Sequence, residues 1–288
     1  MLALILFLSF LSSAIHLVES ILIKKYNERY DKGGSIFTAI VSLFSMLFFV
    51  ITDKGGFDFR LSMLPYGIIA GVCYCTASLA TFIALGCGPF AISKLLLSYT
   101  GIFSISYGLF FRHEKPGVFA LIGIALMLVS VYFNRRPKKE NEQKATVKWA
   151  VCIILTIIGS GMFGVLQKLQ QDLFLDEVNN EFMIVTLGFS ALVLFVIGFI
   201  KDGKDTFYIL KKGTPFAAVA GVSNGLTNFI NIIVNGMAIN FSTLSPLRTG
   251  VGMVLAFIVS IFIFKEKLLK RQIIGVALGT AALILINL

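Results

Sequence analysis

Charged residues are scarce in this sequence: only 14% of its 288 residues are Asp, Glu, Lys or Arg, against 57% from the hydrophobic set. The mean hydropathy is +0.89, and a water-soluble domain could not bury so much apolar surface. Long stretches, among them 118–133 and 191–200, carry no charge at all. Uncharged stretches separated by short charged segments are typical of membrane spans joined by polar loops.

Histidine and cysteine are also scarce, with two and four residues respectively. No H-E-x-x-H sequence occurs, and no apolar stretch carries paired carboxylates, so neither metal ligation nor acid–base catalysis has candidate residues. Cys73 and Cys75 are two residues apart, which places them on different faces of a helix and disfavours a disulfide or a shared metal. We therefore expect no catalytic residue, no metal and no cofactor.

The net charge of +10 comes from Lys and Arg in the segments between the apolar stretches. These residues form no basic face beside exposed aromatic side chains, so nucleic acid is not an expected partner. Basic loops instead orient a membrane protein in its bilayer. The lipid bilayer is therefore the expected environment, and the expected location is the cytoplasmic membrane, crossed several times.

Ten apolar runs are each long enough to cross about 30 Å of hydrocarbon as a helix. They lie near 2–23, 35–52, 64–84, 89–111, 117–133, 147–167, 181–200, 214–236, 243–264 and 272–287. Unbroken runs exclude the alternating pattern of a membrane β-barrel. The sequence thus predicts an all-α integral membrane protein with ten transmembrane helices.

The most polar connection, 134–148, divides these runs into five and five, and the two halves share a register. Offsets of 150 and then 152 match Pro65 with Pro215, Gly71 with Gly221, Glu114 with Glu266, Lys115 with Lys267, and Gly123 with Gly275. Matched Pro, Gly and Glu-Lys positions indicate an internal repeat. We expect a first five-helix repeat at 1–134, a basic linker at 135–146 and a second five-helix repeat at 147–288.

Five is an odd number, so the second copy enters the membrane in the opposite sense to the first. Inverted repeats are a common basis of alternating access in secondary transporters, with the substrate site near the midplane where the copies meet. The fold expected is therefore ten transmembrane helices as two inverted five-helix repeats.

These features resemble the drug/metabolite transporter superfamily, and specifically its EamA-like ten-helix members. The resemblance rests on the two five-span halves, on Gly88-Pro89 opening the fourth span, on the two matched Glu-Lys pairs, and on the sequence GSGMFGVLQK at 159–168. It covers essentially the whole chain and implies a transport role without naming a substrate. It also implies that both termini are cytoplasmic, whereas the positive-inside rule, applied to the basic loops, places them outside.

Two titratable residues of the first span are candidates for coupling transport to an ion. His16 and Glu19 are three residues apart and share a helix face with Ser12. A proton or cation site would use such a pair, because histidine titrates nearest to neutral pH. Alternatively, Glu19 lies one turn from the end of the span and reaches water among the lipid headgroups.

Two cations are candidates for binding an anionic solute. Lys94 and Arg248 lie about six residues inside the fourth and ninth spans, roughly 7 to 9 Å deep. Together they could form a positive pole near the axis that relates the two copies. Alternatively, both side chains extend to the membrane surface.

A polar stripe marks the eighth span, where asparagine recurs at Asn224, Asn228, Asn231 and Asn235. The matching third-span positions include Tyr74, Ser78 and Thr81, so the same face is polar in both copies. Such amides either hold helices together or supply donors and acceptors to a polar solute in a hydrated cavity. The second interpretation makes these seven residues candidates for substrate binding.

The sequence therefore favours a secondary transporter for a small polar metabolite, with an amino acid or organic acid preferred and protons as the candidate coupling ion. It would act as a monomer or a homodimer. An exporter of cationic or lipophilic drugs is the alternative within transport. A membrane-embedded lipid-modifying enzyme, a channel and a scaffold are less favoured.

Overall fold

The chain folds entirely into helices in this computed structural model, which describes residues 2–30, 33–53, 56, 60–113, 117–133, 147–175, 177–203, 206–237, 241–265 and 270–286. The α-helices are α1 (Leu2–Tyr30), α2 (Gly34–Thr52), α3 (Leu64–Cys87), α4 (Phe90–Leu97), α5 (Gly101–Phe110), α6 (Val118–Phe133), α7 (Val147–Phe174), α8 (Asn179–Asp202), α9 (Thr206–Gly236), α10 (Phe241–Phe262) and α11 (Lys270–Ile286). Short 3₁₀ turns are η1 (Leu61–Met63) and η2 (Ser98–Thr100). The expected all-α class is confirmed, and the linker 135–146 and both Glu-Lys pairs lie outside the described residues.

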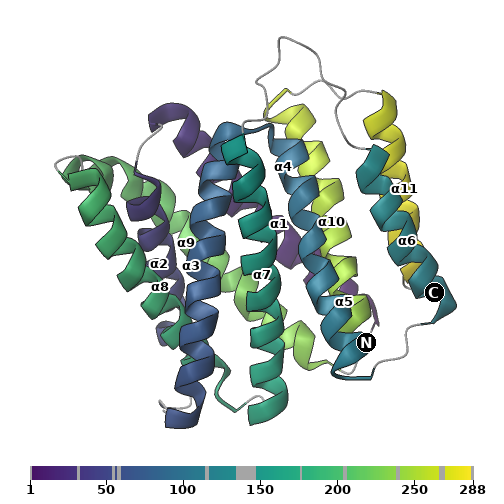
Figure 1. The fold of residues 1–288 in the computed structure, drawn as a ribbon, viewed down its shortest axis with the longest axis horizontal. Helices are drawn as coiled ribbons and strands as arrows, with labels where there is room; N and C mark the ends of the chain where they lie inside the picture. Colours follow the sequence, from purple (N-terminus) through teal and green to yellow (C-terminus); the bar gives the residue numbers. More distant parts are fainter. Residues whose placement is uncertain are drawn as a thin grey trace.

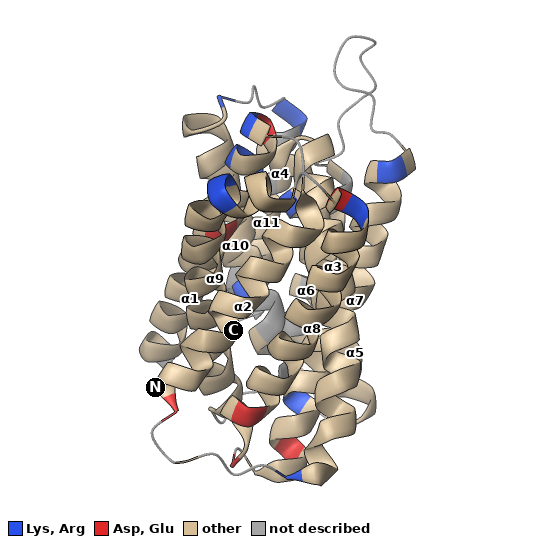
Figure 2. Cartoon of the chain, turned by 90° about the vertical axis from the view of Figure 1, so that its left-hand side faces the viewer, with Lys and Arg blue, Asp and Glu red and all other residues tan. Residues whose placement is uncertain are grey.

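A helix occupies each of the ten apolar runs, and within the described residues six helices are long and apolar enough to cross a membrane. These six are α1, α2, α3 together with η1, α7, α8 and α9. The chain is therefore a multi-pass membrane protein by helix length and composition. Figure 2 agrees with this, because the charged residues gather at the two ends of the bundle and few lie between them.

The fourth run differs from the prediction of one continuous helix, because η2 separates α4 from α5. The hydroxyl of Ser98 donates to the carbonyl of Lys94 at 3.2 Å, and such hydroxyls compete with the helical hydrogen bonds of the backbone. Glycine follows at Gly101. A 3₁₀ segment inside a longer helical run is a frequent site of bending.

Helices of the two halves alternate across the bundle (Figure 1). Helix α3 packs against α7 and α8, and α9 packs against α1 and α2. The pair α6 and α11 stands at one side, with α10 as the neighbour that links it to the rest. The centre of the bundle is therefore built by residues far apart in the sequence.

Two glycines allow these helices to approach closely. A Cβ atom added at Gly71 would lie 3.0 Å from the carbonyl oxygen of Thr186 in α8. At Gly221 it would lie 2.6 Å from the carbonyl oxygen of Val41 in α2. Small residues at such crossings let backbones meet without side chains between them, which fixes the walls of the interior.

Candidate functional site

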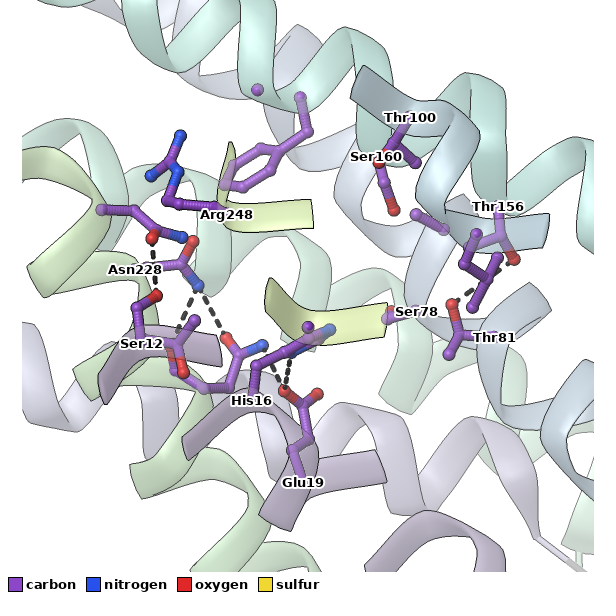
Figure 3. A pocket seen from close by; sticks show the side chains of 18 of the residues that line it. Ser12, His16, Glu19, Ser78, Thr81, Thr100, Thr156, Ser160, Asn228 and Arg248 are labelled. Atoms are coloured by element: carbon purple, nitrogen blue, oxygen red, sulfur yellow. Dashed lines mark hydrogen bonds and ion pairs between the residues drawn. The ribbon is translucent and has the colours of Figure 1, made fainter. Parts of the chain in front are cut away.

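Ser12, His16 and Glu19 are three or four residues apart, so they share one face of α1. This face is directed into the bundle (Figure 3). Phe7 and Phe10, on the opposite face, are at least half exposed at the apolar exterior of the bundle. The Glu19 side chain is only 10% exposed. It therefore does not reach water at the end of the helix, and it requires partners inside the bundle.

Asn224 is the main partner of Glu19. Its amide nitrogen donates to Glu19 Oε2 at 3.0 Å. Its side-chain oxygen accepts from Tyr74 at 2.8 Å, from Ser45 at 3.0 Å and from Asn228 at 3.0 Å. Asn224 therefore holds Glu19 in place, and Tyr74 in turn holds Asn224. Because the side-chain oxygen of Asn224 already accepts three hydrogen bonds, it has little capacity left to accept one from a solute.

His16 lies between Glu19 and Lys94. Its Nδ1 is 3.2 Å from Glu19 Oε2, and its Nε2 is 3.2 Å from Lys94 Nζ. An ammonium group can only donate, so Nε2 accepts from a charged Lys94 and the remaining ring hydrogen on Nδ1 donates to Glu19. The three groups therefore form a continuous chain of polar contacts with His16 at its centre.

Arg248 belongs to a different cluster. Its Nη2 donates to the side-chain oxygen of Asn235 at 2.9 Å, while Lys168 Nζ donates to the backbone oxygen of Asn235 at 3.0 Å. Ser13 donates to the backbone oxygen of Arg248 at 3.1 Å. The second terminal nitrogen of Arg248, Nη1, is buried and has no hydrogen-bond partner among the described residues.

The two cations thus lie at different levels of the bundle. Glu19 and Arg248 bind Asn224 and Asn235 respectively, which are eleven positions apart on α9, or roughly 16 Å along the helix. Lys94 belongs to the Glu19 cluster through His16. The sequence predicted that Lys94 and Arg248 together form one positive pole. In the structure Lys94 belongs to the level of the Glu19 carboxylate, and Arg248 lies at the other level.

A cavity of about 320 Å³, lined by both polar and apolar side chains, connects these levels. It is lined by all eleven residues that the sequence singled out: His16, Glu19, Tyr74, Ser78, Thr81, Lys94, Asn224, Asn228, Asn231, Asn235 and Arg248. Figure 3 shows asparagine and arginine side chains on one wall, and hydroxyl side chains of Ser78, Thr81, Thr100, Thr156 and Ser160 on the other. Eight α-helices and η2 contribute residues, so the cavity depends on most of the fold.

Sequence reasoning missed several residues of the cavity wall. Thr156, Ser160 and Gln167 come from α7, and Ser104 comes from α5. Lys168 occurred within a motif at 159–168 but was not recognised as a neighbour of Asn235. A polar stripe at helical spacing on α7, from Thr156 through Ser160 and Gly164 to Gln167, was the available signal.

The charges that line the cavity leave one excess positive charge. Counted as formal charges with histidine taken as neutral, the described lining residues hold one acidic side chain, Glu19, and two basic ones, Lys94 and Arg248. No group of three His, Cys, Asp or Glu side chains that could hold a metal occurs in the described part of the chain. The arrangement suits a polar organic solute with an anionic group.

Comparisons with known proteins give a fold and no family. No protein-family model matches the sequence, and no curated protein matches it. Among 28 matching chains of solved structures, one described only as "Crystal structure of protein" is 14% identical, with a TM-score of 0.59. The match covers 95% of each chain, so this architecture has been seen before in a protein of similar length.

Proposed function

We propose that this chain is a secondary transporter of ten transmembrane helices, which moves a small polar metabolite with an anionic group across the cytoplasmic membrane. The observation that carries the proposal is Arg248, which lines the cavity and whose buried Nη1 has no hydrogen-bond partner among the described residues. A buried guanidinium donor without a partner is costly. A carboxylate at this position would supply the missing acceptor in the planar geometry that arginine prefers.

Two inverted five-helix repeats, at 1–134 and 147–288, are part of the proposal, and the helix pairing supports them. The contacts of α3 with α7 and α8 correspond, when the halves are exchanged, to those of α9 with α1 and α2. Gly71 and Gly221 match in the repeat and make equivalent close contacts with a neighbouring backbone. A pseudo-two-fold relation of this kind would place the cavity where alternating access requires it.

The size and chemistry of the cavity favour an amino acid or a small organic acid. A volume of about 320 Å³ is at the small end of the usual range for ligand pockets, about 300 to 1,000 Å³. Asn231 lines the same cavity, is partly exposed, and accepts from the hydroxyl of Ser12 at 2.7 Å. Its amide offers hydrogen bonds to hydroxyl or amino groups of the solute.

Coupling to protons would use the chain formed by Lys94, His16 and Glu19. Each bound proton adds one positive charge to the cavity and therefore favours binding of an anion. By linkage, a bound anion favours proton uptake to the same extent. Symport of an anion with protons is thus the expected form of coupling.

Uptake by purified protein in liposomes tests the proposal. The panel holds an amino acid, a monocarboxylate, a dicarboxylate, a neutral sugar and a lipophilic cation, each with and without a proton gradient. Saturable uptake of an anionic or zwitterionic solute that follows the gradient supports the transporter. Uptake of the lipophilic cation alone would replace it with a drug exporter centred on Glu19, and non-saturable flux would indicate a channel.

A further inference from the structure

A cluster of charges lies between the cavity and the end of the bundle where α5 and α7 end. Asp172 of α7 is 3.2 Å from Lys168 Nζ through Oδ1. Its Oδ2 is 3.3 Å from Arg112 Nε and accepts from the hydroxyl of Tyr107 at 3.3 Å. We refer to Lys168, Asp172, Arg112 and Tyr107 as the Asp172 cluster, which joins α5 and the residue that follows it to α7.

The Asp172 cluster is continuous with the anion site. Lys168 is 7% exposed and donates both to Asp172 and to the backbone oxygen of Asn235. Asn235 in turn accepts from Arg248 through its side chain. Asp172 is therefore the acidic partner of the buried Lys168. Lys168 binds the backbone oxygen of Asn235 and Arg248 binds its side-chain oxygen, so both basic side chains contact this one residue.

Two further features indicate that this end of the bundle moves. The side chain of Gln170 is fully buried, and neither its oxygen nor its nitrogen has a hydrogen-bond partner in the described part of the chain. Buried amides are rarely left in that state, and a second conformation that admits water would satisfy both atoms. The 3₁₀ turn η2 lies between Lys94 and Tyr107 and gives α5 a place to bend.

We propose that the Asp172 cluster is the gate at this end of the cavity, and that the anionic group of the solute opens it by drawing Lys168 away from Asp172. When Lys168 turns toward the solute, Asp172 keeps Arg112 and Tyr107 but loses its contact within α7. The bend at η2 then lets α5 move outward. The opening by solute rests on the proposed transport function, whereas the gate itself does not.

The gate is tested by labelling, without any solute. In a chain that lacks Cys73, Cys75, Cys87 and Cys152, Ser160→Cys places one thiol in the cavity wall. A membrane-impermeant maleimide is applied from one side in intact cells and from the other in inverted vesicles. Asp172→Asn should raise the labelling rate from the gate side by about tenfold, equivalent to about 1.4 kcal/mol, and leave the rate from the other side unchanged.

A second variant and a matched control make the result decisive. Arg112→Gln should raise the same rate, which keeps the test valid if Asp172→Asn does not fold. Arg60→Gln breaks the more exposed pair of Arg60 and Glu177, 2.7 Å apart at the same end of the bundle, and should leave labelling unchanged. Equal rates in Asp172→Asn and the parent would overturn the gate, as would an equal rise in Arg60→Gln.

The role of the solute is tested in the same single-cysteine protein. Glutamate, succinate and inorganic phosphate are added separately at millimolar concentration with Asp172 intact. At least one should raise labelling from the gate side, and Lys168→Gln should abolish that rise. If none of the three anions raises labelling, opening by an anion is wrong, and the test of the gate with Asp172→Asn is unaffected. If Asp172→Asn opens the gate but no solute is transported in liposomes, the transport proposal fails instead.

Discussion

Arg248 is the residue on which the proposed substrate class depends most. The perturbation is a series at this position, in which Lys keeps the charge, Gln keeps a donor for Asn235, and Ala removes both. In the structure Nη2 donates to Asn235 at 2.9 Å, and the buried Nη1 has no hydrogen-bond partner among the described residues. The series therefore separates charge, shape and the contact with Asn235.

The expected losses follow from the contacts that each substitution removes. Truncation of one partner of a buried charge pair costs about 2 to 5 kcal/mol, so Arg248→Ala should weaken substrate binding by about thirty-fold to four-thousand-fold. Arg248→Lys loses one hydrogen bond to a charged group, about 1.5 to 3 kcal/mol. Asn228→Ala or Asn231→Ala removes neutral hydrogen bonds of about 0.5 to 1.5 kcal/mol, so the losses there should be smaller.

The assay is the concentration dependence of uptake in liposomes, compared with binding of the same solute to purified protein. Arg29→Ala is the matched control, because Arg29 is an exposed arginine near the end of α1 and lies outside the cavity wall. Normal binding by Arg248→Ala would refute the reasoning and would mean that Arg248 has a structural role. Equal losses in Arg248→Lys and Arg248→Gln would refute the role of charge while preserving that of the planar fork.

Three other predictions test coupling, orientation and packing. Glu19→Gln removes a titratable carboxyl from the chain with His16 and should flatten the pH dependence of uphill uptake; an unchanged profile would contradict coupling at Glu19. A single cysteine at Asn141 should resist an impermeant thiol reagent in intact cells if the basic linker is cytoplasmic, and ready labelling would support cytoplasmic termini instead. Gly221→Ala should lower thermal stability by about 1 to 3 kcal/mol because its Cβ would meet the backbone of α2, whereas Gly117→Ala, which meets nothing within 4 Å, should not.

The helices and the polar face of the cavity could be predicted because both follow from periodicity. Apolar runs give the positions of membrane helices directly, and asparagines at helical spacing define one face of α9. The predicted repeat also pointed to Tyr74, Ser78 and Thr81 through their match to that face. All three line the cavity, although whether they bind substrate stays a prediction.

The distribution of hydrogen bonds within the cavity could not be predicted, because it depends on which helices become neighbours. Nothing in the sequence shows that Ser45 and Tyr74 both donate to Asn224, which leaves that amide occupied. The Asp172 cluster depends in the same way on α5 lying beside α7. The 3₁₀ turn η2 was missed because the proline of the run 89–111, Pro89, stands at its first position and no other proline marks an interruption.

Glu19 and Arg248 differ in how fully their hydrogen-bonding atoms are paired, and this difference bears on where the proposed solute would bind. Glu19 Oε2 has two donors, His16 and Asn224, so the carboxylate is stabilised without any solute. Arg248 has one acceptor for two terminal nitrogens, and a buried donor left unpaired destabilises the empty protein. A solute that binds Arg248 removes this cost, whereas one that binds Glu19 must replace hydrogen bonds already made. The hydrogen bonds already made therefore favour binding of an anion at the Arg248 level over binding of a solute at the Glu19 level, as the proposed function expects.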